Sequence, residues 1–304
     1  MGDRRVVVAG GTGFVGRALV ERLAQAGYTP VVLVRKGGTS PRGASETAEW
    51  DGMSAGPWHT RLEGACAVVN LAGESIASGR WTRARKQRIL SSRLNATRAV
   101  VGGMEAASAR PSLLINASAV GIYGHVPEGE VTEEHPPGRG FLPGVCFRWE
   151  EEALRAKAAG IPTVLLRTGV VLGKGGGALG RMIPPFRLFL GGALGSGRQW
   201  FPWIHMEDVC GAVLHLLQKS PVSGILNLAA PESVTMIEFA RTLGAVLFRP
   251  SLFRVPAPLV RVLLGEMSSM LLEGQKAVPR RLLELGYRFR YPALREALEE
   301  IAGG

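Results

Sequence analysis

Three glycines near the N-terminus have the spacing of a phosphate-binding turn. They follow the apolar, β-branched run Val6 to Ala9 and precede a segment whose apolar residues recur at helical intervals. Glycines at such a junction allow a tight turn, close approach of a pyrophosphate to the backbone, and close packing of helix on strand. We therefore predict a dinucleotide site, against the alternative of a turn without ligand. The turn comprises Gly10, Gly11, Thr12, Gly13, Phe14, Val15 and Gly16.

The end of the second expected strand selects between the two nicotinamide dinucleotides. An NAD enzyme places Asp or Glu there, where it binds the ribose 2′-hydroxyl. This chain has Arg35 and Lys36 after Val34. A guanidinium can bind a 2′-phosphate through two hydrogen bonds, and no carboxylate is present to repel that phosphate. We predict NADP(H), with a solvated surface pair as the alternative for these two side chains.

Several segments spread over residues 6–301 together resemble the atypical extended short-chain dehydrogenase/reductases of the epimerase family. The matching segments are GGTGFVG (10–16), NLAGE (70–74), SRLNATR (92–98), SAVGIYG (118–124), RTGVVLGKGGG (167–177), FPWIHMEDV (201–209), NLAAPE (227–232) and LLEGQKAVPRRLLELGYRF (271–289). This resemblance implies a Rossmann fold, NADP binding and chemistry by hydride transfer. It also implies further cofactor contacts at Leu71, Ala72, Gly73, Glu74 and Arg93, although Arg93 could equally be a charge on a helix surface.

The chain departs from its superfamily at the proton-transfer residues. Ordinary members carry a serine and a YxxxK pair, in which the lysine lowers the pKa of the tyrosine. Here no tyrosine is followed four residues later by lysine, and the matching positions hold Leu142 and Cys146. The candidate catalytic residues are therefore Ser118 and Tyr123. For Ser118 the alternatives are that its hydroxyl only caps a strand end, or that Ala119 occupies the family's serine position. For Tyr123 the alternative is a half-buried aromatic wall without a catalytic role.

Two polar residues of the FPWIHMEDV segment are further candidates. His205 and Asp208 lie three residues apart where a helix is expected to begin, and they could orient a loop or a substrate. The resemblance implies that this segment closes the substrate cleft. An N-cap is an equally good interpretation of Asp208. A single histidine without further ligands does not make a metal site, and we predict none.

The elements expected to position these residues alternate between strand and helix. Such alternation predicts an α/β Rossmann fold with a doubly wound parallel sheet. We expect a Rossmann domain over residues 1–245, with parts of 174–205 facing the substrate cleft, and a small, mostly helical C-terminal domain over 246–304. The expected strands are 6–9, 29–34, 67–71, 113–117 and 163–166, and the expected helices are 14–26, 81–107, 148–159, 258–264 and 294–301.

Net charge, apolar runs and cysteine content indicate which partners and which cellular compartment to expect. The formal net charge is +11, but the arginines are scattered, and the densest run, 80–93, is interleaved with apolar residues at helical spacing. We expect no nucleic-acid partner. No apolar run reaches the roughly 18 residues of a membrane span, so we expect no membrane partner. Three widely spaced cysteines favour the cytoplasm or another reducing compartment, mitochondrial and nuclear locations included.

Two functions remain open from the sequence. The first is an NADP(H)-dependent oxidoreductase or epimerase-like enzyme acting on a small polar substrate of unknown identity. The second is a catalytically inactive NADPH-binding sensor or scaffold protein, which the missing YxxxK favours. The sequence does not predict the oligomeric state.

Overall fold

The computed structural model describes residues 4–219 and 221–303. Its centre is a parallel sheet of seven strands in the order β12-β7-β5-β4-β1-β2-β3. The order in which strands are added to the sheet reverses between β1 and β4, as it does in a doubly wound nucleotide-binding sheet. The predicted fold class is therefore confirmed. The strands are β1 Arg5–Ala9, β2 Thr29–Val34, β3 Glu46–Glu49, β4 Ala67–Asn70, β5 Leu114–Ala119, β7 Thr163–Thr168 and β12 Gly224–Leu228.

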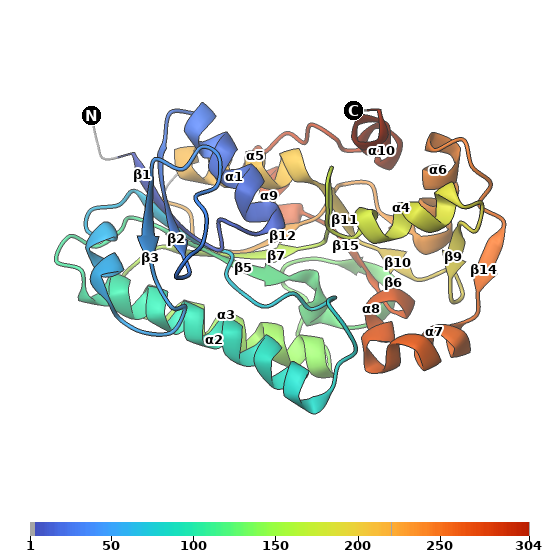
Figure 1. Cartoon of the computed structure of the whole chain (residues 1–304), viewed down its shortest axis with the longest axis horizontal. Coiled ribbons are helices and arrows are strands. Elements are labelled where there is room, and N and C mark those ends of the chain that lie inside the picture. The colour runs from blue at the N-terminus through green and yellow to red at the C-terminus, as the bar shows by residue number, and fades with distance from the viewer. Residues whose placement is uncertain (1–3, 220, 304) are drawn as a thin grey trace.

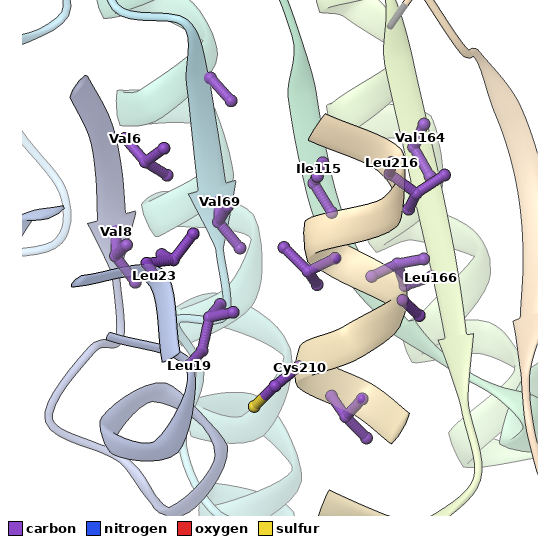
Figure 2. Close-up of a cluster of buried hydrophobic side chains, with 14 of the residues drawn as sticks. Val6, Val8, Leu19, Leu23, Val69, Ile115, Val164, Leu166, Cys210 and Leu216 are labelled. Atoms are coloured by element: carbon purple, nitrogen blue, oxygen red, sulfur yellow. The ribbon is translucent and has the colours of Figure 1, made fainter. Parts of the chain in front are cut away.

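Helices cover both faces of this sheet (Figure 1). The helices α1 (Phe14–Gln25) and α5 (Met206–Lys219) lie on one face, and α2 (Arg83–Ala106) and α3 (Phe141–Ala158) lie on the other. The inner strands β1, β2 and β4 are buried on both faces, as their apolar sequences predict, whereas the edge strand β3 is mostly exposed. Figure 2 shows the core on the α1 and α5 side, where Leu19, Leu23 and Leu216 meet Val6, Val8 and Val69. Cys210 belongs to this core as a small buried side chain.

The C-terminal region is mostly helical but is tied to the body by strands. The predicted helices at 258–264 and 294–301 are present as α7 (Ala257–Leu264) and α10 (Leu294–Ala302), with α8 (Ser269–Leu272) and α9 (Arg280–Glu284) between them. Strand β14 (Phe253–Val255) pairs with β9 (Gly192–Leu194), and β15 (Gln275–Ala277) pairs with β6 (Val126–Val131). Helix α10 packs on α6 (Met236–Val246).

Short elements between β7 and α6 complete the chain. Strand β8 (Val170–Leu172) pairs with β11 (Trp203–His205), and β10 (Trp200–Phe201) pairs with β13 (Val234–Thr235). Helix α4 (Leu179–Arg187) is flanked by two glycine-rich stretches, 173–180 and 191–197. The 3-10 helices are η1 (Pro57–Arg61), η2 (Val120–Tyr123) and η3 (Gly265–Ser268). In the part of the chain that is described, no helix has the length and apolar character needed to cross a membrane.

The structure differs from the expected elements at the start of one helix and in a strand that was not predicted. Helix α3 begins at Phe141, seven residues before the predicted start, because Pro143 lies in the first turn, where its missing N–H leaves no helical hydrogen bond unmade. Strand β3 was not predicted, because its sequence ETAE lacks an apolar run and it lies at the sheet edge.

Gly10 and Gly16, the first and last glycines of the phosphate turn, are in tight backbone contact. A Cβ on Gly16 would lie 2.2 Å from the Gly10 carbonyl oxygen, and a Cβ on Gly10 would lie 2.8 Å from the Leu71 carbonyl. Gly10 also has a φ of 81°, which favours glycine. A side chain at either position would therefore prevent the close approach of the turn to α1 and to the end of β4.

We predict that Gly16→Ala lowers the free energy of unfolding by about 2 kcal/mol or more, because the added methyl group overlaps backbone that cannot rotate away. The matched control is Gly102→Ala, in α2, where nothing lies within 4 Å of the new Cβ. That variant should gain roughly 0.5 kcal/mol from the lower entropy of its unfolded chain. Urea denaturation measures both, and equal effects would contradict the packing argument.

Candidate dinucleotide site and adjoining cleft

The phosphate turn presents free backbone donors at the start of α1. Gly13 caps this helix with φ −75° and ψ 176°, no side chain caps it, and its first turn has no acidic residue. Thr12 and Gly13 are exposed, and only the Gly10 oxygen, at 3.3 Å, would approach a Cβ on Gly13. An anion can therefore reach the uncapped amides and the positive end of the helix dipole, so the residues present fit a pyrophosphate.

The side chains of the turn support it from behind. Phe14 lies under the glycine-rich loop 173–177, because Cβ atoms built on Gly176 and Gly177 would lie within 3 Å of its ring. Val15 packs against the core on the α1 side. The amides of both residues belong to the first helical turn, where a phosphate would be held, while their side chains fix its position.

The NLAGE segment forms the second wall. The Leu71 amide continues from β4 by donating to the Ala9 carbonyl, and the Ala72 amide donates to Asn70 Oδ1 at 3.2 Å. The carboxylate of Glu74 pairs with Arg85 and Arg88, each at 3.5 Å. Leu71 and Ala72 thus lie against Gly10 of the turn, and their contact with a cofactor stays a prediction.

Arg93 is held in place and does not belong to a helix surface. Its Nη1 donates to the carbonyl oxygens of Glu74 and Ile89 at 3.0 Å, and its guanidinium lies over the Trp149 ring at 5.0 Å. A Cβ on Gly73 would contact the Arg93 side chain at 3.1 Å. Burial lowers the pKa of Arg93, and the nearby Cys146 and Glu74 oppose that shift. The interpretation as a solvated helix charge is therefore wrong.

Arg35 and Lys36 lie at the rim of a cavity of about 810 Å³ beyond β2 and β3. Both side chains are exposed, and Trp50, Asp51 and Trp58 form other parts of the lining. Asp51 is tied to its own loop, because Oδ1 accepts from the amides of Met53 and Ser54 at 2.7 Å, and these bonds lower its pKa. Arg35 and Lys36 thus adjoin the end of β2, where they could bind a 2′-phosphate, and the carboxylates of Glu49 and Asp51 line the same cavity.

A second cavity, of about 800 Å³, opens at the carboxyl ends of β5 and β7. Ala119, Gly121, Thr168 and Gly169 contribute strand ends and adjacent backbone, and Cys146 lies at the α3 side. Most of the remaining wall is apolar or aromatic, formed by Ile76, Trp81, Phe141, Leu142, Trp200, Phe201, Met270 and Leu272. The glycine-rich loops 173–180 and 191–197 do not line this cavity, whereas residues 200–202 do. We call it the cleft.

The two candidate catalytic residues belong to a buried network beneath the cleft. Tyr123 is 2% exposed and Ser118 is 4% exposed, and neither lines the cavity. The Tyr123 hydroxyl donates to Asn227 Oδ1 at 2.6 Å and accepts from Arg167 Nη1 at 3.0 Å. Burial raises the pKa of Tyr123 despite that guanidinium. The interpretation as a half-buried wall is wrong, because Tyr123 is enclosed.

Ser118 is joined to the same network through an ion pair. Its Oγ donates to Glu150 Oε1 at 2.6 Å, and Arg167 binds both oxygens of Glu150, at 2.9 and 2.8 Å. Burial opposes the charge of Arg167, but the bonds from Glu150 outweigh it and raise the arginine pKa. Ser118 therefore does not cap a strand end, and no hydroxyl from this pair reaches the cleft.

Cys146 replaces the family lysine with a neutral group. Desolvation, with the nearby Glu150 second, raises the pKa of its thiol to about 12, against the smaller effect of Arg93. The thiolate is therefore scarce at neutral pH, and Cys146 lacks the ionised form that nucleophilic chemistry requires.

His205 and Asp208 position the C-terminal segment. Asp208 accepts from the amides of Arg290 and Tyr291, at 2.7 and 3.0 Å, so it is not an N-cap, and α5 begins two residues earlier at Met206. His205 contacts Glu300 at 3.2 Å and stacks on Tyr291. Desolvation lowers the pKa of His205, which keeps the ring neutral at neutral pH. Neither residue lines the cleft.

A buried amide cluster was missed by the sequence analysis. Asn70 Nδ2 donates to Thr97 Oγ1 and to Asn116 Oδ1, at 2.9 and 2.7 Å, and Trp149 Nε1 also donates to Thr97. This cluster fixes the ends of β4 and β5 against α2 and α3. The available signal was that Asn70 ends one apolar strand and Asn116 lies within another, since their partners are distant in the sequence.

The sheet order, the uncapped glycine turn and the cleft at the strand ends define a Rossmann protein of the atypical extended short-chain dehydrogenase/reductase class. Residues 6–229 match the model of the NAD dependent epimerase/dehydratase family, and residues 255–301 match a domain of unknown function, DUF1731. The chain belongs to this epimerase/dehydratase family.

Similar proteins span nearly the whole chain. The chloroplastic SDR39U1 homologue of Arabidopsis thaliana, an epimerase family protein, is 41% identical over 97% of this chain and 86% of its own. The epimerase family protein SDR39U1 of Bos taurus is 41% identical over 98% and 99%. The crystal structure of human SDR39U1 (isoform 2) with NADPH superposes with a TM-score of 0.90, at 38% identity and 99% coverage of both chains.

We predict that Tyr123→Phe lowers the free energy of unfolding by roughly 1–3 kcal/mol, because Asn227 and Arg167 each lose a buried partner. Tyr291→Phe is the control, since its hydroxyl makes no hydrogen bond to a described residue and should change stability by less than about 0.5 kcal/mol. Urea denaturation provides the measurement. Unchanged stability of Tyr123→Phe would contradict the structural role of the phenol.

Proposed function

We propose that this protein is an NADPH-dependent oxidoreductase whose hydride acceptor binds in the cleft. The observation that carries the proposal is the pair Arg35 and Lys36 at the cavity beside β2, where an NAD enzyme has a carboxylate. The uncapped start of α1 supports it, as does the NADPH complex of the human relative. Arg93 is a further candidate cation for the dinucleotide, because it is fixed beside Gly73 and Glu74.

The chain's own groups divide the work of such an enzyme. The amides of Phe14 and Val15 would hold the pyrophosphate, because the Gly13 amide already donates to the Gly10 carbonyl, and Arg35 with Lys36 would select the 2′-phosphate. Bound NADPH supplies the hydride. The apolar cleft wall would exclude water from the acceptor, and the Gly121 backbone with Thr168 offers polar groups at the strand ends.

The cleft lacks a side chain suited to donate a proton at neutral pH. Among its described lining residues there is no Tyr, His, Lys or Asp, and the ionisable ones are Arg139, Cys146, Arg261, Glu266 and Glu273. Glu266 is paired with Lys86 at 2.7 Å, and the high pKa of Cys146 makes its thiol a weak acid. We infer that the proton comes from water, which suits conjugated acceptors that spread the incoming charge.

These walls favour an apolar, conjugated substrate over the small polar one that the sequence suggested. Quinones and enones have this chemistry, whereas an isolated ketone gives an alkoxide that needs an acid. The nucleotide would thus lie at the switch point of the sheet, as in other doubly wound proteins, with the substrate beside it at the ends of β5 and β7.

The first test concerns cofactor choice. NADPH should bind at least about tenfold more tightly than NADH, a difference of about 1.4 kcal/mol, and Arg35→Ala should remove that preference. Arg42→Ala, an exposed arginine of the following loop that does not line the cavity, should leave the preference unchanged. Fluorescence titration measures both constants. Equal binding of the two nucleotides by the unmodified protein would refute the proposed pocket.

The second test concerns the acceptor. NADPH oxidation should be faster with simple quinones and enones than with aliphatic ketones, with kcat/KM nearly flat between about pH 6 and 9 because water, and not a side chain, supplies the proton. Tyr123→Phe should keep most of its turnover at a temperature where it is folded. A steep pH dependence that disappears in this variant would restore Tyr123 as the proton donor.

The second candidate function is a catalytically inactive NADPH-binding sensor or scaffold protein. It is favoured by the enclosure of Ser118 and Tyr123 and by the thiol at position 146. Tight NADPH binding without oxidation by any acceptor of the panel would select this candidate.

A further inference from the structure

Large apolar side chains are exposed on two neighbouring loops at one end of the molecule. One loop follows α4 and the other joins α6 to β14, and β14 pairs with β9 between them (Figure 1). Soluble proteins scatter such residues singly, and a concentration of them marks an interaction surface. The apolar face, as we name it, consists of Leu188, Phe189, Leu190, Phe248, Leu252 and Phe253, which are 53–88% exposed.

Backbone strain holds two of these side chains outward. Phe189 has a φ of 61° and Phe248 a φ of 54°, and they are the two non-glycine residues with positive φ in the described chain. This conformation costs roughly 1 kcal/mol for each residue. Strain of this kind persists where function requires a particular presentation of the side chain.

The charge around the apolar face has one sign. Residues 175–206 and 239–265 supply this end of the molecule and contain no Asp or Glu, but they contain seven arginines. Arg187 adjoins Leu188 and is exposed, and Arg249 lies over the Phe189 ring at 4.7 Å. Glu238, which borders this region on α6, already interacts with Arg241, so a second copy docked face to face would mainly bring arginine against arginine. The expected occupant is therefore anionic and accepts apolar side chains.

Helix α7 extends this surface toward the cleft. Leu259, Val262 and Leu263 are 49%, 70% and 60% exposed, while Arg261 of the same helix lines the cleft. One end of the molecule thus combines apolar side chains, arginines and an edge of the substrate cavity.

We propose that the apolar face docks the protein on membrane surfaces that contain anionic lipids. Its leucine and phenylalanine side chains enter the boundary between headgroups and acyl chains, and the arginines pair with lipid phosphates. The prediction of no membrane partner rested on the lack of a spanning run, and surface docking needs none. This inference does not depend on the proposed reaction.

The test uses the full chain and sucrose-loaded vesicles of phosphatidylcholine, with and without phosphatidylglycerol. The protein should sediment with anionic vesicles, and much less with neutral ones. Leu188→Gln/Phe248→Gln/Leu252→Gln and Arg187→Glu/Arg249→Glu should each weaken this binding about tenfold or more. The control, Phe147→Gln/Leu154→Gln/Leu283→Gln, changes exposed apolar residues elsewhere and should bind like the unmodified protein.

Light scattering and circular dichroism accompany the binding measurements. Variants that keep the fold and the mass of the unmodified protein but lose vesicle binding support the proposal. Three results overturn it: no binding of the unmodified chain to anionic vesicles, equal loss in the control, or a dimer that the leucine and phenylalanine substitutions convert to a monomer. Retention on an acidic protein resin with no vesicle binding would likewise assign the face to a protein partner.

Discussion

The ion pair between Arg167 and Glu150 is the interaction on which the site most depends. Both side chains are nearly enclosed, at 5% and 7% exposure, and burying an unpaired charge costs several kcal/mol. Two parallel hydrogen bonds and the additional bonds to Ser118 and Tyr123 satisfy the charges. Because Tyr123 ends η2, whose Val120 and Gly121 line the cleft, the pair also fixes the floor of that cavity.

The polar network around this ion pair joins distant parts of the chain. Arg167 comes from β7 and Glu150 from α3, while Asn227 of β12 accepts from Tyr123 and donates to the carbonyls of Val131 and Val278. The central sheet and the C-terminal segment are thereby joined through one polar network. Such networks stabilise a fold when every member is satisfied.

The sequence predicted the elements whose signal is local. Strands such as β1 and β2 are uninterrupted apolar runs, and the role of glycine in the phosphate turn follows from its lack of a side chain, so both were found. Strand β12, in which Asn227 interrupts the apolar residues, was missed. Strand β3 was missed because ETAE has no apolar run, and the predicted start of α3 at residue 148 missed its first turns, which contain Pro143. The roles of Tyr123 and Ser118 could not be predicted, since Tyr123 and Asn227 are 104 residues apart. Spacing alone cannot reveal such a contact.

Glu300, in the last helix, reaches back to the phosphate turn. It pairs with Lys174 at 2.8 Å and with His205 at 3.2 Å, and Lys174 belongs to the loop that covers Phe14. During synthesis the glycine turn leaves the ribosome early, whereas its covering loop gains this anchor only when α10 has been translated. A chain that ends before Glu300 would therefore keep the glycine turn but lack the ion pair that anchors Lys174 in the loop over Phe14.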